Sequence, residues 1–147
     1  MGTRHDAALE LVLSLHRLLR SLRRAGPTGG LQPTQLILLS QLTEAGPSRV
    51  GVLADRVPCS QPTATAAVAE LEGAGLVCRE PDPTDGRATR VAITDKGTDA
   101  LLGVAHGEAE ALLRRLGSLG TPEAEHVLAA APLLRRLADT SAHPDRA

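Results

Sequence analysis

Two stretches of the sequence carry side chains suited to contact a polyanion. The first holds the hydroxyl and amide groups of Ser60, Gln61, Thr63 and Thr65. The second holds the guanidinium groups of Arg79, Arg87 and Arg90. Hydroxyls and amides bind phosphate oxygens and base edges, and a guanidinium can enter a narrow minor groove. We therefore predict that both stretches contact double-stranded DNA.

Arg87 is the strongest single candidate, because it follows the turn signal Asp85-Gly86 and so lies near the tip of a predicted hairpin. A narrow minor groove rich in A·T pairs concentrates negative potential, which attracts such a side chain. Asp85 is expected to orient Arg87 or to close the turn, since phosphate repels a carboxylate. Arg79 and Arg90 remain open between contact with the DNA backbone and a solvated strand face.

The polar residues of the first stretch lie at the start of a predicted helix. Ser60 and Thr63 are expected first as capping residues, with contact to phosphate or bases as a second role. Gln61 and Thr65 are the stronger candidates for direct contact, because neither is needed for the cap or for the core.

Other chemistries have less support. The five histidines lack the spacing of a metal site, so we expect no metal and no cofactor. We find no phosphate-binding loop and no nucleophile elbow, so no catalytic residue is assigned and an enzyme is the least favoured class.

Cys59 precedes a helix N-terminus, where the dipole favours a thiolate. A redox-sensing regulator that uses Cys59 is therefore an alternative to a simple packed thiol. Cys78 is expected in the core.

The composition of the 147-residue chain narrows the classes of partner. Phe, Tyr and Trp are all absent, which removes the stacking platforms of single-stranded nucleic-acid modules. The formal net charge of −1 provides no general basic field, so DNA binding must rely on a few placed arginines. The apolar runs are too short to cross a bilayer, and we recognise no signal peptide, so a cytoplasmic protein without membrane contact is expected.

Hydrophobic periodicity predicts the helices that position these side chains. One helix covers residues 6–24, and a second runs from about residue 32 to the Gly46-Pro47 break. Ser48 is expected to cap a short third helix that ends at Pro58. Its expected inward residues are Val52, Leu53 and Val57. The fourth helix, capped by Ser60, is expected to pack through Ala64, Ala67, Val68 and Leu71.

The period then changes to that of β-strands. Residues 76–80 and 89–93 are predicted strands, and Thr94 is expected to cap the helix that follows them. Pro132 is expected to kink or split the last helix, and the tail from Ser141 to fray. Two helices joined by a tight turn and followed by a hairpin predict a mainly α, α+β fold: a winged helix-turn-helix with a small β-hairpin wing.

These residues resemble the MarR (multiple antibiotic resistance) family of transcriptional regulators. Residues 31–35 are similar to the opening of the family's second helix, and Ser60-Gln61-Pro62-Thr63 with residues 71–77 to its recognition helix and exit. Residues 82–88 resemble the family's wing, and residues 93–97 the start of the next helix. Together the motifs cover residues 31–97 in the family's order.

The resemblance implies a homodimer whose terminal helices, in 1–30 and 98–147, carry a DNA-binding lobe at 31–97. It also implies a pseudo-palindromic operator, and a repressor that responds to a small-molecule effector held between the lobe and the dimer helices. The residues assigned to that crevice are His16, Arg17, Arg20 and Gln35. A buried interface role for His16, and a solvated face for the two arginines, are the favoured alternatives.

A departure from the family's pattern keeps another class open. Ala66 stands where family members commonly carry a basic or bulky polar residue, and Asp55, Glu70 and Glu72 make the surroundings of the recognition helix acidic. A winged-helix protein-interaction module that has lost specific DNA binding is therefore the alternative.

Overall fold

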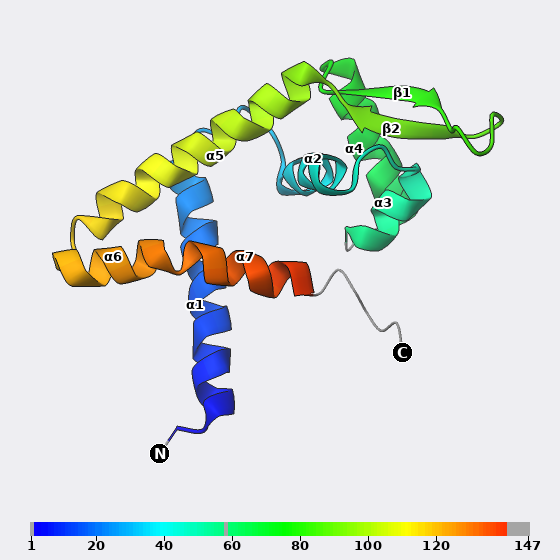
Figure 1. The fold of residues 1–147 in the computed structure, drawn as a ribbon. Helices are drawn as coiled ribbons and strands as arrows, with labels where there is room; N and C mark the ends of the chain where they lie inside the picture. Colours follow the sequence, from blue (N-terminus) through cyan, green and yellow to red (C-terminus); the bar gives the residue numbers. More distant parts are fainter. Residues whose placement is uncertain (1, 58, 141–147) are drawn as a thin grey trace. The chain divides into compact units, whose positions relative to one another are not determined.

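The computed structural model describes residues 2–57 and 59–140, which form helices and one short β-hairpin (Figure 1). The expectations for Pro58 and for the tail from Ser141 lie outside the described residues. The helices are α1 (Arg4–Ala25), α2 (Pro33–Ala45), α3 (Val50–Arg56), α4 (Gln61–Gly73), α5 (Asp95–Leu116), α6 (Thr121–Ala129) and α7 (Ala131–Thr140). The strands are β1 (Val77–Pro81) and β2 (Thr89–Ile93). The predicted mainly helical fold with a hairpin wing is confirmed.

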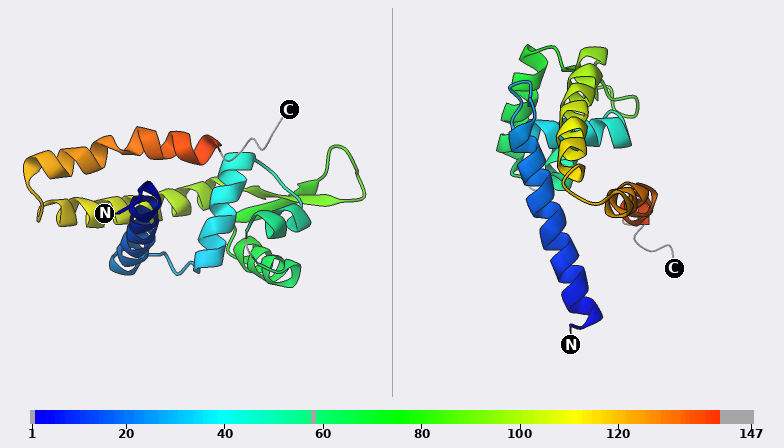
Figure 2. Two further views of the ribbon diagram at one scale, coloured as in Figure 1. Left: turned by 90° about the horizontal axis from the view of Figure 1, so that it is seen from below. Right: turned by 90° about the vertical axis from the view of Figure 1, so that its left-hand side faces the viewer.

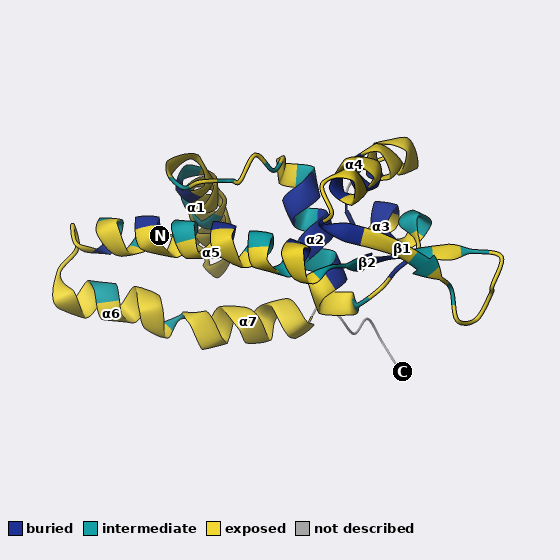
Figure 3. Cartoon of the chain, turned by 90° about the horizontal axis from the view of Figure 1, so that it is seen from above, coloured by how far each residue is buried: buried dark blue, intermediate teal, exposed yellow. Residues whose placement is uncertain are grey.

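The chain divides into two compact units between Glu108 and Ala109. In the first unit, buried residues concentrate in α2, α3, α4 and the hairpin (Figure 3). Leu38 and Leu39 of α2, Leu53 of α3 and Val68 of α4 have no exposed surface. Figure 2 shows these helices gathered at the base of the hairpin, with the loop between the strands projecting beyond them. A single apolar core therefore fixes α4 and the root of the wing together.

Local signals set the helix ends in this unit. Thr3 and Asp6 form a capping box at the start of α1, and Ser60 accepts a hydrogen bond from the backbone N–H of Thr63 at the start of α4. Gly46 and Gly75, which follow α2 and α4, have φ angles of 78° and 75°, in the left-handed region that glycine adopts without strain.

The strands of the hairpin are antiparallel, in a register that pairs Val77 with Ile93 and Pro81 with Thr89. Ser48 extends this sheet by an isolated bridge to Val91, with backbone N···O distances of 3.0 and 2.8 Å in the two directions. The expectation that Ser48 caps α3 is therefore wrong. Arg49 occupies the N-cap position and makes no side-chain cap hydrogen bond there. The backbone of Ser48 is instead committed to β2, which no local pattern indicates.

Two further expectations fail because each side chain points away from the core. Val52 is 40% exposed on α3, whereas its neighbour Leu53 is buried as expected. Cys78 is exposed, because the alternation along β1 turns Val77 inward and Cys78 outward.

The second unit holds the end of α5 with α6 and α7. Ala111 and Leu116 of α5 are buried, whereas α6 and α7 have no buried residue. The expected split at Pro132 is confirmed, since α6 ends at Ala129 and α7 begins at Ala131. Among the described residues, no helix has both the length and the apolar character that a membrane span requires.

Gly97 in the first turn of α5 provides a test of this packing. A Cβ atom there would lie 2.1 Å from the Leu76 carbonyl oxygen, whereas a Cβ atom at Gly103 would meet nothing within 4 Å. We expect Gly97→Ala to lower the free energy of unfolding by about 3 kcal/mol, because backbone must move. Gly103→Ala, the matched control, should raise it by about 0.5–1 kcal/mol. Urea unfolding at one protein concentration measures both changes, and equal effects of the two variants would contradict the packing described.

Candidate nucleic-acid interface

The start of α4 presents the predicted polar residues to solvent. Ser60, Gln61, Thr63 and Thr65 are all exposed, while Ala64, Ala67, Val68 and Leu71 on the opposite face are buried. The Ser60 and Thr63 hydroxyl oxygens lie 2.8 Å apart, and the Ser60 hydroxyl caps the helix. The Thr65 hydroxyl donates to the Gln61 carbonyl at 2.9 Å, and its oxygen can still accept another hydrogen bond. This end of α4 therefore combines a rigid apolar anchor with a polar tip.

The acidic residues further along α4 are both engaged by neighbours. The Gln35 side-chain amide donates to Glu70 at 2.8 Å, and Arg79 on β1 lies 3.0 Å from Glu72. The Arg79 guanidinium offsets the charge of Glu72, whereas the neutral Gln35 amide holds the Glu70 carboxylate without reducing its charge. One of these two acidic side chains is therefore charge-paired.

The arginines of the hairpin differ in what they contact. Arg79 pairs with Glu72, and Arg90 pairs with Glu80 on the neighbouring strand at 2.5 Å. Within residues 2–57 and 59–140, no ion pair or hydrogen bond is found for the Arg87 side chain, which is exposed on the loop between the strands. Arg87 is therefore the hairpin guanidinium that remains available for a phosphate or a groove.

The loop that carries Arg87 is closed by two aspartates. The Asp85 carboxylate accepts a hydrogen bond from the backbone N–H of Arg87 at 3.1 Å, so it shapes the turn. The Asp82 carboxylate accepts from Thr84 and Asp85 within the loop and from Arg49 Nε at 2.8 Å. The Arg49 guanidinium, followed by the Thr84 hydroxyl and amide, holds the pKa of Asp82 well below its usual range. The same hydrogen bond and the negative charge of Asp82 raise the pKa of Arg49.

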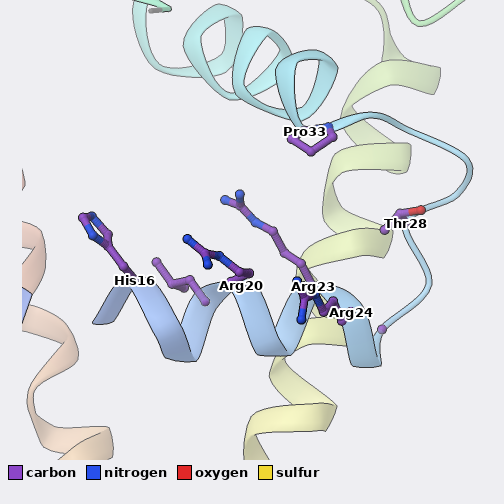
Figure 4. A pocket seen from close by; sticks show the side chains of 8 residues that line it. His16, Arg20, Arg23, Arg24, Thr28 and Pro33 are labelled. Atoms are coloured by element: carbon purple, nitrogen blue, oxygen red, sulfur yellow. The ribbon is translucent and has the colours of Figure 1, made fainter. Parts of the chain in front are cut away.

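The four residues assigned to an effector crevice are not brought together. His16 and Arg20 line one hollow with Arg23, Arg24, Thr28 and Pro33. In Figure 4 the side chains of His16, Arg20 and Arg23 project from the same side of α1, the side on which Pro33 lies at the start of α2. Arg17 lines a separate depression with Asp6 and Glu10, and Gln35 is buried between α2 and α4. The first hollow therefore gathers several cations, but from a residue set that differs from the one expected.

The cysteines and histidines form no further site in the part of the chain that the structure describes. Cys59 is half-buried against the core, and Cys78 is exposed; both are free thiols. Among the described residues, no group of His, Cys, Asp and Glu is arranged to hold a metal ion.

Comparisons with known proteins decide the family. The MarR family model matches residues 31–89. An HTH-type transcriptional regulator of Mycobacterium tuberculosis is 33% identical over 134 residues, which covers 91% of this chain and 94% of that protein. The chain belongs to the MarR family. It is thus a DNA-binding helix-turn-helix transcriptional regulator, with α3 and α4 as the helix-turn-helix and β1–β2 as the wing.

Solved structures agree with this fold for the MarR-family chain. A MarR family protein from Bacillus stearothermophilus superposes with a TM-score of 0.71 at 26% identity, covering 97% of this chain and 99% of that one. A transcriptional regulator from Thermotoga maritima gives a TM-score of 0.73 at 23% identity, covering 93% and 99% of the two chains. Helices before and after the winged lobe are therefore part of the shared fold.

Two arginines of this MarR-family regulator were missed by sequence reasoning. Arg49 contacts Asp82 across a sequence separation of 33 residues, and no spacing rule indicates that pairing. Arg56 is exposed in the last turn of α3 and has no partner among the described residues. Its place shortly before Ser60, next to the turn of the motif, was a signal that could have marked it.

The carboxyl group of Asp82 provides a test of the loop geometry. An ordinary Asp has a pKa of about 3.9. Because the pKa of Asp82 in the folded chain is lower, the ionised carboxylate stabilises the fold above about pH 4, and this stabilisation is lost as the pH falls through the pKa of the folded state. We expect the Asp82 carboxyl carbon signal in NMR to stay flat as the pH falls from about 5 to about 3, a range that spans the usual Asp midpoint. In Arg49→Ala the same signal should begin to titrate in this window. A titrating signal in the unmodified chain would contradict the four-bond arrangement.

Proposed function

We propose that two chains bind a pseudo-palindromic operator as a symmetric dimer in the cytoplasm and repress transcription by occluding a promoter. In each half-site, α4 enters the major groove and Arg87 reaches an adjacent minor groove. The observation that carries this proposal is the pairing pattern: Arg79 and Arg90 are bonded to glutamates, whereas Arg87 at the tip is not. The polar residues proposed to contact DNA with it are Ser60, Gln61, Thr63 and Thr65, with Arg79 and Arg90 as secondary contacts.

The distribution of exposed apolar residues supports a dimer. Among the described residues, every large hydrophobic side chain that is markedly exposed, except Val52, lies outside residues 31–97. Leu11 on α1, Leu113 on α5 and Leu137 on α7 are 54%, 59% and 67% exposed. Apolar surface of this extent on terminal helices favours an interface, and a two-fold interface presents two identical reading lobes. We assign residues 1–30 and 98–147 to this interface and residues 31–97 to the DNA-binding lobe.

The hollow beside α1 supports regulation by an anionic small molecule. Arg20 and Arg24 line it together with His16 and with Arg23, which lies 3.7 Å from the Glu108 carboxylate, close to the segment that joins α1 to α2. An anion bound there would contact both the terminal helix and the start of the lobe. By favouring one arrangement of these elements, it would change the spacing of the two recognition helices and release the operator.

A protein-interaction module without specific DNA binding is the competing function. Ala66 and Ala69 leave the exposed face of α4 without a basic residue, which favours this alternative. The engagement of Glu70 and Glu72 by Gln35 and Arg79 argues against it, because those acids do not lie free beside the helix tip. Gel shifts with random duplex DNA at low salt separate the two functions, since a DNA-binding lobe keeps at least non-specific affinity there.

The operator proposal is tested by footprinting on the DNA upstream of the protein's own gene. We expect two protected half-sites whose centres lie about 10 bp apart, because symmetric winged lobes read positions one helical turn apart. Sedimentation of the complex should give two chains, each of 15.3 kDa, per duplex. Equal affinity for this duplex and for a scrambled one of the same composition would refute the specific repressor.

Arg87→Ala tests the role of the wing tip. We expect the variant to weaken operator binding by about 1–3 kcal/mol, since it removes a guanidinium that reads the groove. Arg87→Lys, the matched variant, keeps the positive charge at the tip but not the planar guanidinium, so it should recover only part of the affinity. Fluorescence anisotropy of a labelled duplex measures both. An Arg87→Ala variant with unaltered affinity would mean that the wing does not read DNA.

A further inference from the structure

The two carboxylate oxygens of Asp82 serve different partners. Oδ1 accepts three hydrogen bonds within the loop, from Thr84 N at 2.8 Å, Thr84 Oγ1 at 2.7 Å and Asp85 N at 3.2 Å. Oδ2 accepts from Arg49 Nε at 2.8 Å. One oxygen thus closes the loop that carries Arg87, and the other attaches this loop to a different part of the lobe.

Arg49 holds a position from which it can fix the angle of the wing. It is the N-cap residue of α3, the first helix of the helix-turn-helix. The preceding residue, Ser48, is hydrogen-bonded in both directions to Val91 on β2. Two contacts therefore join the start of α3 to the wing: the Ser48 backbone bonds to strand β2, and the Arg49 side chain bonds to Asp82 in the loop. Asp82 is well covered in this arrangement, with 11% of its side chain exposed, whereas 44% of the Arg49 side chain is exposed.

A two-stranded hairpin needs such a connection, because it is only marginally stable by itself. Beyond the Ser48–Val91 bridge, the strands run on to Pro81 and Thr89 before the loop begins. Without a connection near the tip, the position of Arg87 would be ordered only on binding, and that ordering costs affinity. Because the Arg49 side of the pair is open to solvent, the pair is screened by water and adds little to global stability, so its effect should be visible in binding rather than in unfolding.

We propose that Arg49 is a positioning residue for DNA recognition: through Asp82 it holds the wing loop at the angle that lets Arg87 reach the groove while α4 occupies its own. This inference rests on the proposed function, since it assumes that Arg87 contacts the operator. Arg49 acts through Arg87 and makes no DNA contact that is needed for its effect.

A double-mutant cycle on the footprinted duplex tests this coupling. We expect Arg49→Ala to weaken binding by about 3- to 10-fold, the scale of ordering a long side chain on complex formation. In the Arg87→Ala background, the same change should weaken binding by less than about 2-fold, because the residue it positions is gone. Additive losses, or a salt dependence whose slope falls by about one for Arg49→Ala, would mean that Arg49 itself binds phosphate and would overturn the proposal.

Asp82→Asn separates positioning from simple electrostatics. The asparagine carbonyl oxygen can still accept from Thr84 and Asp85, but its amide presents donors to Arg49 and cannot accept from it. Loss of a negative charge near DNA should tighten binding if only charge matters. The proposal instead predicts weaker binding, equal to that of Arg49→Ala and not increased in the double variant. Tighter binding by Asp82→Asn would overturn it.

The order of the wing loop is measured without DNA. We expect the NMR order parameters of the Gly86, Arg87 and Ala88 amides to fall in Arg49→Ala and in Asp82→Asn, from values typical of rigid backbone toward about 0.6. The thermal midpoint should remain close to that of the unmodified chain. Unchanged order parameters would refute the positioning role. If the unmodified chain failed to distinguish its duplex from a scrambled one, the proposed function would fail, while this measurement would still decide whether Arg49 orders the wing.

Discussion

The burial of one face of α4 is the constraint on which the rest of the lobe depends. Ala64, Val68 and Leu71 pack into the core formed by α2, α3 and the hairpin, and Val68 has no exposed surface. Because the helix cannot rotate without exposing these side chains, its polar N-terminal end is held outward in one orientation. The same core contains Val77 and Val91, so the strands of the wing are fixed against the helix that they accompany. Recognition helix and wing thus form a single rigid unit at their bases, and only the loop needs a separate support.

Charge is distributed within this unit by pairing rather than by excess. Arg79, Arg90 and Arg49 each contact a carboxylate, and the partners lie on α4, on β1 and in the loop. Such exposed pairs contribute little to stability, but they fix where long side chains point and reduce the free positive charge. Arg56 and Arg87 are the arginines of residues 31–97 without a partner among the described residues. A lobe of this kind attracts DNA weakly in general, so its selectivity must come from the placement of those few groups.

The sequence predicted those parts of the lobe that depend on local signals. The caps at Ser60 and Thr94, the buried face of α4 and the change of period at the hairpin follow from residues close together in the chain. The features that it did not predict depend on contacts between distant segments. Ser48 has the residue type of a helix cap, but its backbone is hydrogen-bonded to Val91 of β2. Arg49 and Asp82 are 33 residues apart in the sequence, and they make contact only because the hairpin packs against α3. The residues assigned to the effector crevice were also not predictable from local sequence, because Arg17 and Arg20 are near in sequence but line different depressions beside α1.

The small number of unpaired cations also explains why a dimer would matter to this regulator. A lobe with few phosphate contacts gains little free energy from the DNA backbone, and Ala66 and Ala69 add no charge on the exposed face of α4. Joining two such lobes makes the second binding event intramolecular, so that the modest affinity of each contributes at a high effective concentration. The gain is lost when geometry prevents both lobes from engaging together. In the proposed dimer, binding would therefore be sensitive to the spacing of the two lobes.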